Sequence, residues 1–270
     1  MMYTIKPIEA GLVGNGSTKG RWTYLTDEGM AFPIPIITFL ITAEGPDDFA
    51  AIVDTGMDQP PGGETESGLE IKGSGPEPIR RGLADEGLEL SDIDTVIMTH
   101  LHIDHTANVG LFPDAEFLIQ RAEWEAAHDP IPHMKHRYDE EHLEELEEVD
   151  VTLIDGGFRI RPGLELILAP GHTKGMQAVL VETANEPHAI VSDLAYTKHN
   201  LEPGLSTLLN GNREKVEVTP SELEYIPPGL NVSTIDCYDS IARISERVGE
   251  DATMLPGHET EILGGIFPES

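Results

Sequence analysis

The densest chemical signal in the chain is the run His100-Leu101-His102-Ile103-Asp104-His105, which holds four possible metal ligands within six residues. It directly follows the apolar residues 95–98, which we predict to form a strand. In an extended segment residues two apart project to the same side, so His100 and His102 can converge on one ion. Asp104 and His105 then turn toward a second ion. The fold must therefore bring a strand end to a place where two metal ions can be bound.

Three further candidate ligands stand singly, each just after a predicted strand. They are His172 in a Pro-Gly-His sequence, Asp193 in Ser-Asp-Leu, and His258 in a second Pro-Gly-His. A lone histidine is more often an ordinary core or surface residue than a ligand, so none of these carries the argument alone. Together with the cluster they supply the missing ligands of two coordination sets.

The remaining sequence predicts short strands with interleaved helices. Nine short apolar runs, bounded by Gly, Pro or charged residues, are typical of strands. They are 35–42, 49–53, 95–98, 116–120, 151–154, 164–168, 177–181, 189–191 and 253–255. The first two flank the turn-rich residues 44–48, which predicts a hairpin. Asp54 and Asp193 both stand at a strand end, which hints at two related halves.

Helices are predicted at three places. One runs from Pro78 to Gly87, and the acid-dense residues 121–148 form others with a solvated face. Ser233 can cap a third, whose apolar stripe is Tyr238, Ile241, Ile244 and Val248. Residues 57–76 are expected to form a surface loop.

The charge balance excludes some partners. Seventeen Lys and Arg face 49 Asp and Glu, a net charge of −32, while 39% hydrophobic residues are enough for an ordinary core. Such a charge repels phosphate backbones and anionic membranes, so we expect neither nucleic acid nor a membrane as partner. Scarce lysine and abundant surface acid also indicate a halophilic source, because high salt screens the repulsion. Ordinary acidity is the alternative.

Cysteine usage and the first residues bear on location. The single Cys237 excludes an intramolecular disulfide and a cysteine-based zinc cluster, so we expect a small core residue. The first residues show no basic leader before an apolar run, and no run approaches the roughly 18 apolar residues of a spanning helix. A cytoplasmic protein is the expectation.

The ligand pattern resembles that of the metallo-β-lactamase superfamily over roughly residues 35–260. The resemblance implies an α/β (α+β) fold, the four-layer αβ/βα sandwich, in a single domain over residues 1–270. It also implies that His100, His102 and His172 bind one metal, that Asp104, His105 and His258 bind the other, and that Asp193 bridges them. Asp54 would orient the histidine loop without binding metal, although an Asp before Thr-Gly can instead cap a turn. Residues 121–150 would be a helical lid, and 200–232 a substrate-loop insertion.

Tyr196, three residues after Asp193, makes the chain resemble the N-acyl homoserine lactonases of this superfamily. The resemblance implies a small-molecule substrate, a lactone opened by a metal-bridging hydroxide, with Tyr196 and Asp104 as catalytic residues. Two divalent ions would be the cofactors, with zinc as the default and Mn, Fe or Co also compatible with these ligands. A homodimer is also expected.

Other functions use the same ligands and stay open at this point. They are a thioesterase of the glyoxalase II type, a phosphodiesterase, a cyclic amide hydrolase and an iron-dependent redox protein. A metal-stabilised interaction protein without turnover is a further alternative, although seven ligands exceed the single four-ligand set of a structural zinc site.

Overall fold

Two β-sheets packed face to face form the centre of the computed structural model, which describes residues 2–14, 19–43, 48–65, 68–249 and 252–268. The first sheet has seven strands in the order β4-β1-β2-β3-β5-β6-β7. Its strands are β1 Thr4–Val13, β2 Ile34–Ala43, β3 Phe49–Val53, β4 Ile71–Lys72, β5 Thr95–Ile97, β6 Glu116–Gln120 and β7 Asp150–Ile154.

The second sheet has five strands in the order β14-β11-β10-β9-β8. Its strands are β8 Phe158–Arg161, β9 Leu164–Leu168, β10 Gln177–Glu182, β11 Pro187–Ser192 and β14 Thr253–Pro256. A separate hairpin joins β12 Thr207–Leu209 to β13 Lys215–Glu217.

The α-helices are α1 Pro76–Ala84, α2 Ile103–Thr106, α3 Arg121–His128, α4 Glu140–Glu147, α5 Lys198–Leu201 and α6 Thr234–Val248. Short 3-10 helices are η1 Lys19–Arg21, η2 Pro61–Gly63, η3 Leu90–Asp92, η4 Val109–Leu111, η5 Lys135–Arg137 and η6 Thr260–Ile262. No helix among the described residues is long and apolar enough to cross a membrane.

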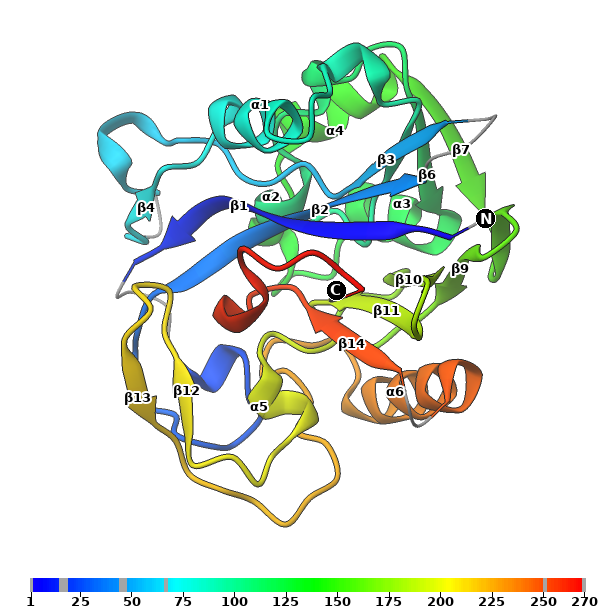
Figure 1. Cartoon of the computed structure of the whole chain (residues 1–270). Coiled ribbons are helices and arrows are strands. Elements are labelled where there is room, and N and C mark those ends of the chain that lie inside the picture. Colours follow the sequence, from blue (N-terminus) through cyan, green and yellow to red (C-terminus); the bar gives the residue numbers. More distant parts are fainter. Residues whose placement is uncertain (1, 15–18, 44–47, 66–67, 250–251, 269–270) are drawn as a thin grey trace.

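Helices cover the outer face of each sheet, so the molecule has four layers (Figure 1). Buried side chains of both sheets, such as Phe39 and Val179, form the core between them. Ile79 of α1 and Leu146 of α4 bury the outer face of the first sheet, and Ile244 of α6 buries that of the second. The four-layer αβ/βα sandwich expected from the ligand pattern is confirmed.

All nine predicted strands are present. Residues 35–42 and 49–53 pair antiparallel as β2 and β3, although 44–47 of the predicted turn lie outside the described residues. The sequence did not reveal β1, because Pro7 and Gly11 interrupt its apolar pattern; β1 nevertheless pairs along β2, with a register shift between Glu9 and Gly11. The short strands β4, β8, β12 and β13 were also missed.

The predicted helices are found, with one correction of a buried face. Ser233 caps α6 and accepts a hydrogen bond from the amide of Asp236 at 3.2 Å. Tyr238, expected in the apolar stripe, is 39% exposed, whereas Cys237 and Ser240 are buried. The expectation for Tyr238 was wrong because the helix packs against the sheet through Cys237 and Ser240. Their small side chains allow a close approach, and Tyr238 is left partly exposed.

Buried amides hold the two sheets together near the carboxyl end of β5. The Gln177 side chain at the start of β10 donates to the carbonyls of Met98 and Leu118 at 2.8 and 3.0 Å. Its carbonyl accepts from Gln120 at 2.9 Å. A buried amide is costly unless it is satisfied, so these bonds fix the relative position of the sheets.

One ionic contact fixes α4 against the loop that follows β3. His142 Nε2 lies 2.7 Å from Asp58 Oδ2, and His142 Nδ1 lies 3.1 Å from Thr106 Oγ1. Burial opposes protonation of His142, but the hydrogen bond and charge of Asp58 outweigh it and raise the imidazole pKa. The hydrogen bond from His142 in turn lowers the pKa of Asp58. Residues 57–76, expected to form a surface loop, therefore also hold α4.

This contact predicts a pH-dependent stability. A raised folded-state pKa means that His142 contributes fully below its unfolded pKa of about 6.5, and that the contribution is lost as pH rises through the folded value. His142→Gln should therefore lower the free energy of unfolding more at pH 5.5 than at pH 9, measured by chemical denaturation. His133→Gln, at an exposed position, is the control. An equal loss at both pH values for His142→Gln would contradict this account.

Candidate metal centre

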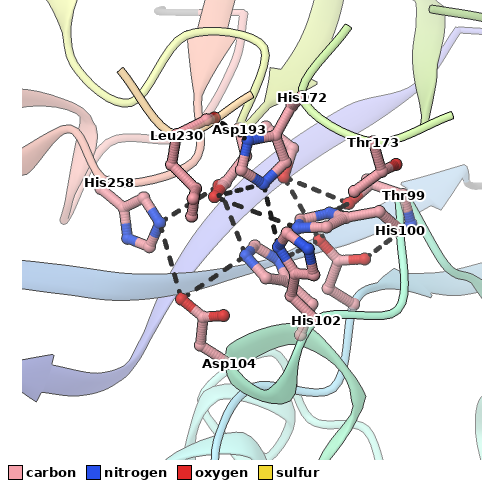
Figure 2. Close-up of polar contacts among 12 residues, drawn as sticks. Thr99, His100, His102, Asp104, His172, Thr173, Asp193, Leu230 and His258 are labelled. Carbon is pink, nitrogen blue, oxygen red and sulfur yellow. Dashed lines mark hydrogen bonds and ion pairs between the residues drawn. The ribbon is translucent and has the colours of Figure 1, made fainter. Parts of the chain in front are cut away.

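Seven side chains converge near the carboxyl ends of β5, β9, β11 and β14. His100, His102 and His172 form one group, and Asp104, His105, Asp193 and His258 form the other; within each group the ligand atoms lie within 4.8 Å of one another. Parallel pairing of β3 with β5 and of β11 with β14 brings these strand ends to one edge of the sandwich. The structure thus brings together all seven residues singled out in the sequence. Figure 2 labels six of them: His100, His102, Asp104, His172, Asp193 and His258.

Asp193 lies between the two groups and faces each with a different oxygen. Its Oδ2 lies 3.4 Å from His172 Nε2 and 4.0 Å from His100 Nε2. Its Oδ1 lies 3.1 Å from His258 Nε2 and 3.3 Å from His105 Nε2. This arrangement suits a carboxylate that bridges two ions.

In four of the histidines the ring nitrogen Nδ1, which faces away from the centre, forms a hydrogen bond with an oxygen of the chain. His172 Nδ1 and His258 Nδ1 each lie 2.7 Å from a backbone carbonyl, that of Leu230 and that of Pro35 (Figure 2 labels Leu230). His100 Nδ1 lies 3.0 Å from Thr99 Oγ1. His105 Nδ1 lies 2.8 Å from Asp54 Oδ2. An Nδ1–H that donates outward leaves the Nε2 lone pair free to bind a metal.

The inward-facing atoms lack hydrogen-bond partners, which tests whether metal ions fit. The atoms are His100 Nε2, His105 Nε2, His258 Nε2 and both carboxylate oxygens of Asp193, all buried. His102 faces its group with Nδ1, which lies 3.0 Å from His172 Nε2. Polar atoms buried without partners are costly, so such a concentration indicates a ligand. Ligands 2.0–2.1 Å from a tetrahedral ion are about 3.3 Å apart, which agrees with the separations around Asp193.

Protonation also suits metal binding. Burial, together with the positive charge of neighbouring imidazoles, keeps the pKa of His100 and of His102 well below the ordinary value, so both are neutral and able to bind a metal. For His105 burial acts in the same direction, but Asp193 and Asp54 outweigh it and raise its pKa well above the ordinary value. An ion binding there would displace that proton.

Asp54 holds the histidine loop from behind. It follows β3 with a φ of 61°, which turns its carboxylate toward β5. Oδ1 accepts the amide of Thr99 at 2.7 Å, and Oδ2 accepts the Thr99 hydroxyl at 2.8 Å. With His105 on the same carboxylate, Asp54 fixes both ends of the cluster.

Tyr196 lies over the second group. Its ring stacks on His258, with centroids 4.8 Å apart and planes 28° apart, and lies 5.7 Å from the His172 ring. Burial, followed by the negative charges of Asp193 and Asp104, raises the pKa of its phenol well above the ordinary value. The hydroxyl therefore remains a proton donor at neutral pH.

Glu123 of α3 is a residue of the centre that the sequence did not reveal. Its buried carboxylate accepts hydrogen bonds from the amides of Leu101 and Gly175, at 3.0 and 3.1 Å, and from the Thr173 hydroxyl at 2.5 Å. It thereby joins the loop of His100 and His102 to the loop of His172. A Cβ on Gly175 would lie 1.9 Å from the Glu123 amide, so this approach requires glycine.

Glu123→Gln should weaken metal binding, because the NH2 group of glutamine would replace a carboxylate oxygen that accepts hydrogen bonds from the surrounding donors. We expect about a tenfold loss of metal affinity, typical of residues that orient ligands, measured by competition with a chelator. The matched control is Glu125→Gln, an exposed position of the same helix. Unchanged affinity in Glu123→Gln would remove the orienting role.

Comparisons with known proteins agree with this geometry. The sequence profile of the metallo-beta-lactamase superfamily matches residues 34–258. An N-acyl homoserine lactonase from Bacillus sp is 33% identical over 186 residues, which cover 64% of this chain and 69% of the relative. The N-acyl homoserine lactonase AttM of Rhizobium radiobacter is 28% identical over 65% of this chain and 61% of its own length.

Solved structures share the fold. A Bacillus thuringiensis AiiA variant with N-decanoyl-L-homoserine at its active site has a TM-score of 0.72 and 24% identity, and the match covers 97% of this chain and 95% of that one. The dizinc quorum-quenching lactonase AidC has a TM-score of 0.66 and 16% identity, covering 98% and 89%. With the profile match over most of its length, the chain belongs to the metallo-β-lactamase superfamily.

Proposed function

We propose that the protein is a dinuclear metal-dependent hydrolase that opens a lactone of the N-acyl homoserine lactone type. The observation that carries this proposal is the position of Tyr196, a protonated phenol stacked on His258 beside the carboxylate of Asp193. A phenol in this place can donate to a carbonyl oxygen held at the centre. The relatives named N-acyl homoserine lactonases support this choice among the hydrolases of the superfamily.

The proposed roles follow from the residues. His100, His102 and His172 would bind one ion, Asp104, His105 and His258 the other, and Asp193 both. When bound, the ions supply a nucleophilic water at neutral pH and polarise the ester carbonyl. Tyr196 would donate to the developing oxyanion.

In the second group only Asp104 is open to solvent. Its side chain is 25% exposed, against 0–1% for His105, Asp193 and His258. It is therefore placed to accept a proton and pass it to the leaving alkoxide.

Several finer properties belong to the same proposal. Zinc suits this histidine-rich set, although Mn, Fe or Co would also fit. Tyr138 of the segment 121–150 has its ring 5.2 Å from the His102 ring, which supports a lid over the centre, and 200–232 would border the substrate. These segments would belong to a single domain over residues 1–270.

The chain's surroundings are also part of the proposal. The charge of −32 supports a salt-rich cytoplasm and a small molecule, rather than nucleic acid, as substrate. A homodimer would cover exposed apolar side chains; these include Tyr24, Leu25, Leu223, Ile235 and Tyr238.

A hydrolysis panel of the metal-loaded protein, at high and low salt, tests the function. The panel contains N-hexanoyl-homoserine lactone, a cyclic amide, a thioester and a phosphodiester. We expect lactone hydrolysis that is lost on chelation and recovers when metal is restored, with greater activity at high salt. Thioester cleavage without lactone cleavage would overturn the proposal, and metal analysis with a dioxygen-consumption assay would expose an iron redox protein.

Tyr196→Phe isolates the phenol, because phenylalanine keeps the stacking on His258 and removes only the hydroxyl. The expected result is a fall in kcat of about a hundredfold, as for loss of one oxyanion donor, with the metal content unchanged. Tyr24→Phe, at an exposed tyrosine, is the control. A variant with full kcat would show that the hydroxyl takes no part in the reaction.

A further inference from the structure

Two segments that each carry an arginine border the group formed by His100, His102 and His172. The carbonyl of Arg21, at the end of η1, accepts the amide of Leu230 at 2.7 Å. Leu230 in turn holds His172 through its own carbonyl. Arg137, at the end of η5, directly precedes Tyr138, whose ring contacts that of His102. Two segments far apart in the sequence therefore bring an arginine to the same side of the centre.

Neither of these arginines has an acidic partner among the described residues. Arg121, Arg159 and Arg247 each lie within 3.1 Å of a carboxylate oxygen. For Arg21 and Arg137 no carboxylate oxygen lies within 4.0 Å in the part of the chain that the structure describes. Arg137 Nε is buried and has no hydrogen-bond partner there. Since a guanidinium is always charged and only donates, this buried N–H needs an acceptor from outside the described chain.

The two guanidinium groups affect each other and Tyr196. Burial first, and then the positive charge of Arg137, lowers the pKa of Arg21. Arg137 also opposes the rise in the phenol pKa that burial causes at Tyr196. The two positive charges therefore repel each other, and an anion bound by both guanidinium groups would remove this repulsion.

We propose that Arg21 and Arg137 form a subsite for a carboxylate carried by the substrate on its acyl chain, away from the ester that is cleaved. This inference rests on the proposed lactonase function. The guanidinium fork matches a carboxylate in shape and charge. An uncharged amide carbonyl would satisfy one N–H and leave two positive charges uncompensated. The net charge of −32 repels anions, so a substrate of this class requires local positive charge at the centre.

Two lactones of equal chain length test the subsite. N-hexanoyl-homoserine lactone has a neutral chain end, whereas the N-adipoyl compound ends in a carboxylate. The quantity measured is the ratio of kcat/KM for the adipoyl to the hexanoyl lactone, at one salt concentration. Arg21→Gln and Arg137→Gln should each lower this ratio by about tenfold, as expected for the loss of a charge-assisted hydrogen bond. Arg80→Gln, on the exposed face of α1, controls for net charge and should keep the wild-type ratio.

A binding measurement separates this inference from the proposed function. Calorimetric titration of the metal-loaded protein with the two ring-opened products compares ligands that share the new carboxylate and differ only at the chain end. Tighter binding of the adipoyl product, lost in Arg137→Gln, supports the subsite even where no lactone is hydrolysed. Hydrolysis of both lactones with equal efficiency, together with equal binding of both products, would overturn the subsite and leave the lactonase function standing.

Discussion

The buried carboxylate of Asp54 joins the functional edges of the two sheets. It stands at the end of β3 in the first sheet and binds Thr99 and His105 of the histidine loop. The hydroxyl of Ser192, at the end of β11 in the second sheet, lies 3.4 Å from the same carboxylate. A buried carboxylate must be fully hydrogen-bonded to be tolerated, so this residue requires both edges to lie in one arrangement. The ligands on either side depend on that arrangement.

Glu123 joins two loops of the centre by hydrogen bonds, as Asp54 joins the ends of strands from the two sheets. Both are buried acids, and among the described residues neither has a lysine or arginine in hydrogen-bond contact. They accept hydrogen bonds from backbone amides, hydroxyls or imidazole. The carboxyl groups of Asp54 and Glu123 lie behind the centre, where negative charge favours the binding of cations. Positive charge instead borders one side, where Arg21 and Arg137 lie. The acidic residues thus lie behind the site proposed for the metal ions, and the arginines lie on the side proposed for a substrate anion.

Much of this arrangement could be predicted from local sequence. Short apolar runs located β3, β6 and β9, and the ligand types identified the centre, because metal chemistry restricts which side chains can take part. Strand β1 could not be predicted, since pairing along β2 overrides the poor strand propensity of Pro7 and Gly11. Glu123 was hidden because an acid in an acid-rich helix looks solvated, and only tertiary packing shows that it is buried. The arginine pair was hidden for a similar reason, since 116 residues of sequence, 137 minus 21, separate its members.

The order of strands around the centre repeats. In the first sheet β2 pairs antiparallel with β3, and β3 pairs parallel with β5; in the second β10, β11 and β14 do the same. The ligands accordingly extend from His100 to His258, a separation of 158 residues. Contacts between such distant segments form only after a large loss of chain entropy. We therefore expect the centre to be completed late in folding, and ions that bind it would act as a cross-link between the two sheets.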